Sequence, residues 1–293
     1  MKNAIAVVLT AVPLLLAGNY SLLNVRPGSG AEQRMLVDTG CEIVHVYDDG
    51  SADCVFEDNE FGALLESGIP FSVRIDDLER FYGRRYRGRS MGGYLTWDEL
   101  SLWLDDLHDT YPAITSSPTS IGDTYQGRPQ TVVKISSNNV FDDDDPGLPN
   151  VWYDGLIHAR EPASMRNVRF FMLWLCENYG GSGFCGLQAT WLLDNREIWC
   201  LPCSNVDGYV YNQQENPDGG GMHRKNMNWS AGGDGVDLNR NWAVGWGGSG
   251  SSGNPGDATY RGTAPLSEPE CANVDSFWQD HPPVQMHSTD RKS

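Results

Sequence analysis

The stretch GLIHAREP, residues 155–162, decides the organisation of this chain. It places an imidazole, His158, and a carboxylate, Glu161, three residues apart at the end of an apolar, strand-like run, so both side chains can point the same way from one turn. His-Glu-His is a ligand set that leaves one coordination position of zinc open for water, so the pair indicates the start of a metal site. On its own the pair is weak evidence, because a surface His and a surface Glu often occur at this spacing by chance.

Around this stretch, strand-like and helix-like segments alternate. Thr96 and Glu99 form a capping box for a helix whose apolar face holds Leu100, Trp103, Leu104 and Leu107. A second helix, 164–179, is apolar on nearly every side and is expected to be buried. The expected strands are 130–135, 150–157, 197–201 and 284–287. This alternation predicts an α/β fold, a three-layer α/β/α arrangement with a mixed central sheet that is incomplete at the C-terminus.

The first 18 residues pair one early cation, Lys2, with the apolar run 4–17. That run is short for a membrane span and suits a signal peptide, which predicts an exported protein. A membrane anchor is the alternative. No later stretch looks transmembrane.

Residues 19–90 have the size of a small α+β pro-segment. We expect strands at 43–47 and 71–75, with a turn at 48–50 and a helix at 60–67 between them. A basic cluster closes the segment and is either a processing site or an ordinary solvated linker; it comprises Arg80, Arg84, Arg85, Arg87 and Arg89. Residues 91–293 then form the predicted catalytic domain.

Composition excludes some partners. The chain has 293 residues with 40% hydrophobic content, enough for a sizeable core, and a formal charge of -18. A nucleic acid would be repelled over most of such a surface, so we expect a soluble, acidic enzyme with no nucleic-acid partner. Separately, we expect a monomer. The acidic run 142–145 lacks the spaced ligands and glycine of a calcium loop and is interpreted as solvated.

Seven cysteines in an exported chain suggest disulfides, with at least one thiol left over. Cys176 and Cys185 flank a Gly-rich turn and form the favoured pair. Cys200 and Cys203 have C-x-x-C spacing, but no second pair follows at zinc-finger spacing, so we expect buried strand cysteines there.

Further polar motifs accompany the His-Glu pair. HRKN at 223–226 contains Arg224, and VDLNRNW at 236–242 combines a carboxylate, two amides and a guanidinium. Together with HARE they match, in order, the signature of the zinc carboxypeptidases of the carboxypeptidase A/B type, which the chain resembles from about residue 91 onward. The other matching motifs are Met91-Gly-Gly-Tyr94, Asn205-x-Asp-Gly-Tyr209, Thr259-Tyr-Arg-Gly262, Ser267-Glu-Pro-Glu270 and Met286-His-Ser288.

The resemblance implies one Zn²⁺, held by His158, Glu161 and His287, and a peptide C-terminus as substrate. It makes Arg224 the cation that polarises the scissile carbonyl and stabilises the oxyanion. Asn239 and Arg240 would hold the terminal carboxylate, for which a planar guanidinium fork is matched.

Two acidic residues receive supporting roles. Asp237 is expected to accept the second N–H of a zinc-ligating imidazole, with a loop-capping role as the alternative. Glu270 precedes a predicted helix, 271–279, and is expected to be structural.

The resemblance also predicts a gap. The family places a general-base Glu, a substrate-contacting Tyr and the specificity pocket after the third zinc ligand, and only six residues follow His287. No residue matches the base, so we expect an incomplete product that is inactive or weakly active.

Three functions therefore remain open. The chain is a secreted zinc carboxypeptidase, a non-catalytic relative that binds zinc or peptides, or a zinc-dependent deacylase of the wider superfamily. The preferred C-terminal residue is left undetermined.

Overall fold

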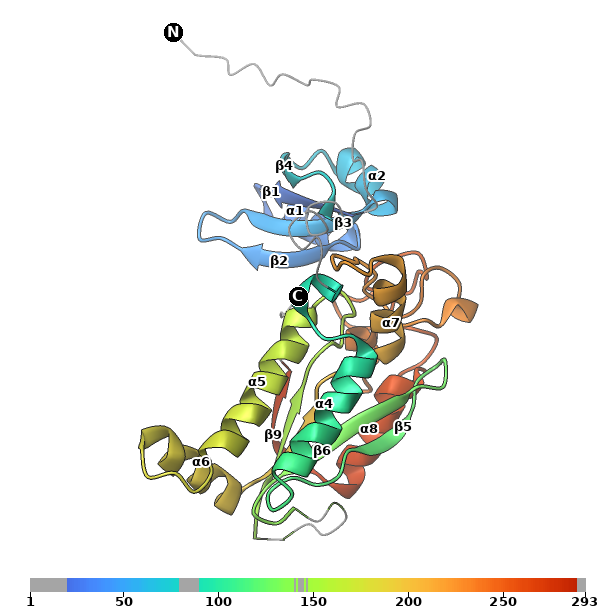
Figure 1. Cartoon of the computed structure of the whole chain (residues 1–293). Helices are drawn as coiled ribbons and strands as arrows, with labels where there is room; N and C mark the ends of the chain where they lie inside the picture. The colour runs from blue at the N-terminus through green and yellow to red at the C-terminus, as the bar shows by residue number, and fades with distance from the viewer. Residues whose placement is uncertain (1–19, 79–89, 140, 142–144, 146, 289–293) are drawn as a thin grey trace.

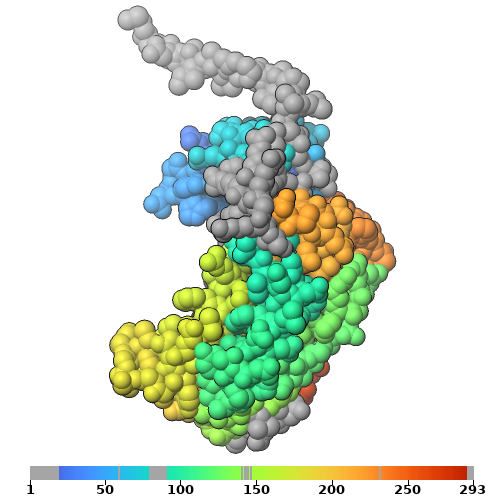
Figure 2. All heavy atoms as spheres, in the orientation of Figure 1, coloured from blue at the N-terminus to red at the C-terminus, as the bar shows by residue number. Residues whose placement is uncertain are grey.

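The computed structural model describes residues 20–78, 90–139, 141, 145 and 147–288, which form two stacked units (Figures 1 and 2). We call residues 20–78 the N-terminal unit and residues 90–288 the main unit. The expected signal peptide, the basic cluster and most of the acidic run lie outside the described residues. Among the described residues, no helix is long and apolar enough to cross a membrane.

The N-terminal unit is an antiparallel four-stranded sheet, in the order β2-β3-β1-β4, with two helices. Leu23, Cys54 and Leu64 are fully buried in its core. The expected strands and helix are present, and β1, α1 and β3 are additional. The elements are β1 Tyr20–Val25, α1 Gly30–Asp38, β2 Glu42–Val46, β3 Ala52–Glu57, α2 Asp58–Ser67 and β4 Phe71–Ile75.

The main unit has a mixed five-stranded sheet, in the order β5-β6-β8-β7-β9, which confirms the predicted α/β class. Strand β7 pairs in parallel with β8 and β9, whereas β6 pairs antiparallel with both β5 and β8. The strands are β5 Thr119–Asp123, β6 Pro129–Ile135, β7 Asn150–Asp154, β8 Glu197–Leu201 and β9 Pro283–Ser288. The helices are η1 Ser90–Gly93, α4 Trp97–Thr110, α5 Pro162–Asn178, α6 Phe184–Asn195, α7 Val206–Glu215, η2 Trp229–Ala231, η3 Leu238–Arg240 and α8 Pro269–Asp280.

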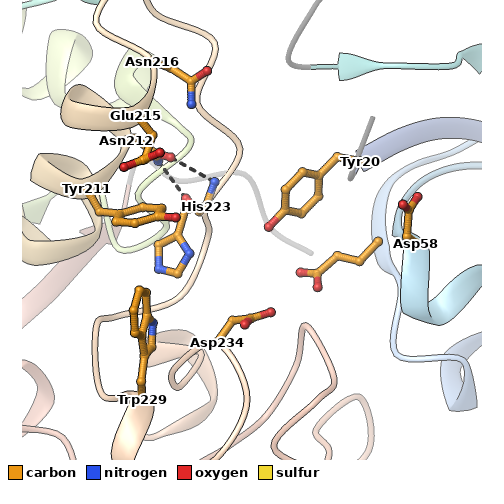
Figure 3. Close-up of a pocket in the computed structure, with 10 residues that line it drawn as sticks. Tyr20, Asp58, Tyr211, Asn212, Glu215, Asn216, His223, Trp229 and Asp234 are labelled. Carbon is orange, nitrogen blue, oxygen red and sulfur yellow. Dashed lines mark hydrogen bonds between the residues drawn. The ribbon is translucent and has the colours of Figure 1, made fainter. Parts of the chain in front are cut away.

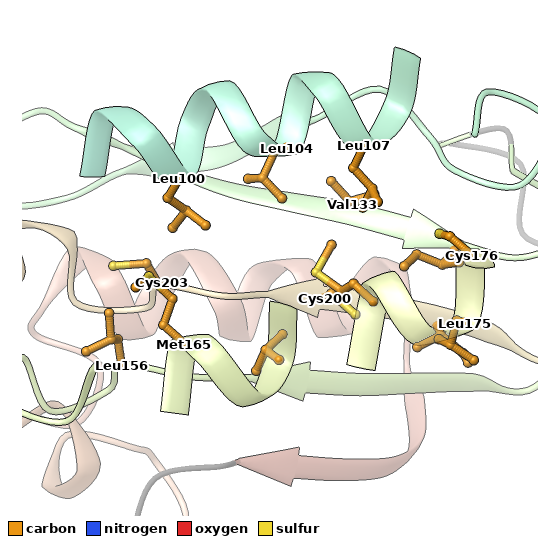
Figure 4. Packing of buried hydrophobic residues seen from close by; sticks show 14 of the residues in the cluster. Leu100, Leu104, Leu107, Val133, Leu156, Met165, Leu175, Cys176, Cys200 and Cys203 are labelled. Atoms are coloured by element: carbon orange, nitrogen blue, oxygen red, sulfur yellow. The ribbon is translucent and has the colours of Figure 1, made fainter. Parts of the chain in front are cut away.

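Alternating side chains of the sheet build two cores. Val133 and Cys200 face α4 and α5 (Figure 4), whereas Val132 and Trp199 face Phe277 of α8. The period-two alternation of the strands therefore produces three layers, with the sheet in the middle. Thr96 caps α4 through the predicted capping box with Glu99.

Two expectations about this core need correction. Helix α5 is not buried all round, because Phe170 on its outer side is 70% exposed. Cys176 and Cys185 do not pair, and all seven cysteines are free thiols. The reason is geometric: Cys176 faces the sheet from α5, whereas Cys185 lies exposed in the first turn of α6. Cys200 and Cys203 are buried as predicted, Cys200 within β8 and Cys203 just after it.

Candidate metal centre

The HARE loop lies where β7 ends against α5. Gly155 is required there, because an added Cβ would lie 2.9 Å from the backbone carbon of Ser164. Leu156 then turns the chain with a positive φ of 53°, an uncommon conformation for a residue with a side chain. Its amide donates to Ser164 Oγ over 2.8 Å. This turn directs His158 inward, to complete burial.

Asn205 fixes the loop against the segment that carries Arg224. Its side-chain amide donates to the carbonyls of Ile157, Arg224 and Lys225. The amide of Ala159 donates to the carbonyl of Arg224 over 3.1 Å. The HARE and HRKN motifs, which lie far apart in the sequence, are therefore held together by hydrogen bonds to their backbone.

Asp237 accepts from three donors at this place. His158 Nε2 lies 3.2 Å from Asp237 Oδ1, which also accepts the amide of Asn239 over 2.9 Å. Arg224 Nη2 donates to Asp237 Oδ2 over 2.9 Å. Although burial opposes ionisation, Arg224 and His158 hold the pKa of Asp237 far below its usual range. An ionised carboxylate only accepts, so the proton of a neutral His158 lies on Nε2 and Nδ1 carries the lone pair.

His158 Nδ1 faces Glu161. The distance from Nδ1 to Glu161 Oε2 is 3.5 Å, and this oxygen is buried and accepts no hydrogen bond within the described part of the chain. Tetrahedral zinc with bonds of about 2.1 Å separates its ligand atoms by roughly 3.4 Å. The pair therefore has the spacing and the donor chemistry of two zinc ligands.

A third carboxylate joins this pair. Ligand atoms of Glu42, His158 and Glu161 all lie within 4.8 Å of one another. Glu42 is the first residue of β2 in the N-terminal unit. No local sequence signal marked Glu42 as a site residue.

His287 is not brought to this group. It lies within β9 in register with Tyr153, and its ring stacks on the Tyr153 ring at 4.8 Å between centroids. Residues in parallel register share a face of the sheet, and Tyr153 packs on Phe171 of α5. The side chain of His287 is therefore directed toward the α5 face, whereas His158 lies beyond the end of β7. Its role as third zinc ligand stays a prediction.

Arg224 is 1% exposed and lies among carboxylates. Its Nη1 is 2.8 Å from Glu42 Oε1, in addition to the bond with Asp237. Burial lowers the pKa of Arg224, but Asp237 and Glu42 outweigh it, so the pKa is raised well above its usual value. The guanidinium is therefore a permanent positive charge beside the His-Glu pair.

Asn239 and Arg240 form the last part of η3. Arg240 Nε donates to the carbonyl of Gly250 over 2.8 Å, and Nη1 donates to the carbonyl of Asn239 over 3.1 Å. Both side chains are partly exposed, as a substrate-binding role requires. Glu270 is buried and accepts from the Tyr125 amide and from Asn226 Nδ2, and burial raises the pKa of Glu270 to about 7. These contacts fit the expected structural role.

Cavities lie where the described parts of the two units meet. One, of about 360 Å³, is lined by Glu42, Arg160, Glu161 and Met222 among others and opens beside the His-Glu pair. Another, of about 490 Å³, is shown in Figure 3, where Tyr20 of the N-terminal unit stands across from His223, Tyr211 and Trp229 of the main unit.

Comparison with known proteins places these features in a family. The family model for zinc carboxypeptidases, Peptidase_M14, matches residues 100–290. Carboxypeptidase A2 of Mus musculus is 32% identical over 241 residues, 77% of this chain and 54% of the relative. Carboxypeptidase B of Bos taurus is 31% identical over 228 residues, 74% of this chain and 51% of the relative. The chain thus spans about half the length of these two relatives.

A solved structure shows the same fold. Carboxypeptidase A from Helicoverpa armigera superposes with a TM-score of 0.71 at 20% identity, covering 92% of this chain and 69% of that one.

Proposed function

This chain belongs to the zinc carboxypeptidase family, and from that premise we propose that it is a metallocarboxypeptidase that hydrolyses the C-terminal peptide bond of peptides. The observation that carries the proposal is the chain of contacts from Asp237 through His158 to Glu161, at 3.2 and 3.5 Å. In zinc sites, a ligating imidazole typically donates its second ring N–H to a carboxylate, which fixes the tautomer and leaves the lone pair of the other nitrogen for the metal.

The residues present fit one zinc ion. His158 Nδ1 and Glu161 would hold it, and the family resemblance proposes His287 as a further ligand. Bound zinc would act as a Lewis acid and lower the pKa of a coordinated water to about 7.

The chain's own residues supply the other steps. Arg224 is held beside the pair by Asp237 and would stabilise negative charge on the carbonyl oxygen of the substrate. Asn239 and Arg240 would bind the free terminal carboxylate, the group that makes an exopeptidase selective for chain ends. Among the residues that the structure describes, we assign no general base, a role that contributes typically about 10² to 10⁴ in rate.

We further propose that residues 1–18 are a signal peptide, that 19–90 form a pro-segment and that 91–293 form the catalytic domain. This organisation would place the mature protein outside the cell, as a monomer. The proposed pro-segment includes the whole N-terminal unit, which lies on the end of the main unit that carries His158.

A non-catalytic relative that binds zinc or peptides is the second candidate. One observation favours it: His287 stacks on Tyr153 and does not join His158 and Glu161. Such a protein would still bind a peptide carboxylate through Asn239 and Arg240.

The test is to incubate the full chain with peptides and to measure released C-terminal amino acids, with and without a chelator. We expect release that stops on chelation and returns with zinc. Peptide binding without release would support the second candidate. If acylated small molecules are hydrolysed and peptides are not cleaved, the chain is a deacylase and the carboxypeptidase proposal is refuted.

A further inference from the structure

The carboxylate of Glu42 crosses from the N-terminal unit into the metal centre of the main unit. It stands at the start of β2, and its side chain is only 5% exposed. Glu42 Oε2 is paired with Arg160 Nη2, and Glu42 Oε1 lies 2.8 Å from Arg224 Nη1. One carboxylate therefore contacts two arginines of the main unit, Arg160 in the HARE loop and Arg224 in the HRKN motif.

The ion pairs of Glu42 are buried. The side chains of Arg160 and Arg224 are 4% and 0% exposed, so the ion pairs are formed away from solvent. A buried carboxylate is tolerated when charged donors surround it, and the two guanidinium groups fix its direction. Each carboxylate oxygen has two acceptor sites, so pairing with the arginines leaves capacity for a further bond.

That remaining capacity lies beside His158 and Glu161. A ligand atom of each of the three residues lies within 4.8 Å of the other two. One imidazole nitrogen and two carboxylate oxygens are a donor set that zinc accepts.

On the basis of the proposed function, we propose that Glu42 is an additional protein ligand of the zinc ion, bound beside His158 and Glu161 at a site that spans the two units. The metal then joins the N-terminal unit to the main unit. The same carboxylate occupies Arg224, so an incoming substrate must displace Glu42 from both the metal and this arginine.

The competing interpretation is that Glu42 only forms ion pairs with the two arginines and does not bind the metal. Zinc affinity separates the two, because an ion pair with arginine does not require metal. The experiment titrates zinc into the purified full chain against a chromogenic chelator at neutral pH. It compares the unmodified chain with Glu42→Gln, Glu42→Asp, Glu161→Gln and His287→Ala.

Glu60→Gln is the matched control. Glu60 also belongs to the N-terminal unit and contacts the main unit, since its Oε1 accepts the amide of Ala258 over 3.1 Å, but it is not in the metal group. We expect Glu42→Gln to weaken zinc binding by about ten-fold or more, and Glu60→Gln to leave it within about two-fold. Glu42→Asp keeps the negative charge that pairs with the arginines but shortens the side chain, so it should also weaken zinc binding. This variant preserves the test if Glu42→Gln fails to fold.

Cobalt substitution supplies a readout that is independent of affinity. The visible absorption of the Co²⁺-loaded chain should change in Glu42→Gln and not in Glu60→Gln, because only the first removes a ligand.

The failures are distinguishable. Loss of zinc in Glu161→Gln with unchanged affinity in both Glu42 variants would overturn the inference and leave the proposed function standing. Loss in His287→Ala with unchanged Glu42 variants would assign the third position to His287. If the unmodified chain binds no zinc, or Glu161→Gln binds it equally well, the proposed function itself fails.

Discussion

Asp237 Oδ1 lies 3.2 Å from Nε2 of His158, and both side chains are fully buried. The contact orients the imidazole and places its lone pair on Nδ1, toward Glu161. Asp237 thereby determines which nitrogen of His158 can bind a metal.

Replacing Asp237 should therefore reduce metal affinity. We expect Asp237→Ala to weaken zinc binding by about ten-fold or more, because the imidazole loses its acceptor. Asp237→Asn keeps a carbonyl oxygen at this position and should lose less. Equal metal content of the Ala variant and the unmodified chain, after dialysis against a chelator, would contradict the role.

Arg240 should determine the affinity for free C-termini. A hydrogen bond to a charged group contributes about 1.5–3 kcal/mol, so Arg240→Ala should weaken peptide binding by roughly ten-fold to one hundred-fold. Isothermal titration with a peptide and its C-terminally amidated form provides the measurement and the control. If the two forms lose affinity equally in the variant, Arg240 does not bind the carboxylate.

His223 should make stability fall in mild acid. Burial lowers the pKa of His223 to about 4 from 6.5, and Nε2 lies 3.3 Å from the carbonyl of Asn226. The folded chain binds this proton more weakly than the unfolded chain, so the contribution is complete above pH 6.5 and is lost as the pH falls from about 6.5 to about 4. At one pKa unit per 1.36 kcal/mol, the loss is about 3 kcal/mol at most.

Urea unfolding of the full chain and of His223→Gln across this pH range would measure the effect. The variant should show a shallower decline, while carboxylates that are common to both chains contribute equally. Parallel curves would show that His223 is not responsible.

Lys134 and Glu197 form a buried ion pair between β6 and β8, at 3.2 Å with both side chains fully buried. Lys134→Met should destabilise the fold by about 3–5 kcal/mol, because it leaves a buried carboxylate without its partner. The double variant Lys134→Met with Glu197→Gln should recover part of that loss. Chemical denaturation would compare the free energies of unfolding, and a double variant no more stable than Lys134→Met would contradict the prediction.

The cysteines provide a test of the pairing. Alkylation of the unfolded chain without reductant should modify all seven thiols, and in the folded chain Cys185 should react first because it alone is exposed. Mass spectrometry would count the labels. A count short of seven would show a disulfide, and the absence of label from the peptides that carry Cys176 and Cys185 would identify that pair.

The sequence predicted helices and strands where caps or short residue patterns mark them. The capping box of Thr96 and Glu99 begins α4, and the run 197–201 is strand β8 as expected. Helix α7 was missed, because Gly208 in its first turn weakens a helical pattern. Glycine is needed there for a tertiary reason: an added Cβ would lie 2.6 Å from the carbonyl oxygen of Lys225.

The sequence by itself supplied the candidate donors of the site, since His158, Glu161, Arg224 and Asp237 stand in ordered motifs at strand ends and turns. Only the tertiary structure decided which donors converge. It brought Glu42 to Arg160 across 118 residues of chain, and it held His287 on Tyr153 through the register of β9 with β7. The spacing of residues determines side-chain directions within one strand, helix or turn. The contact between the two units depends on the packing of surfaces distant in sequence, which no local pattern describes.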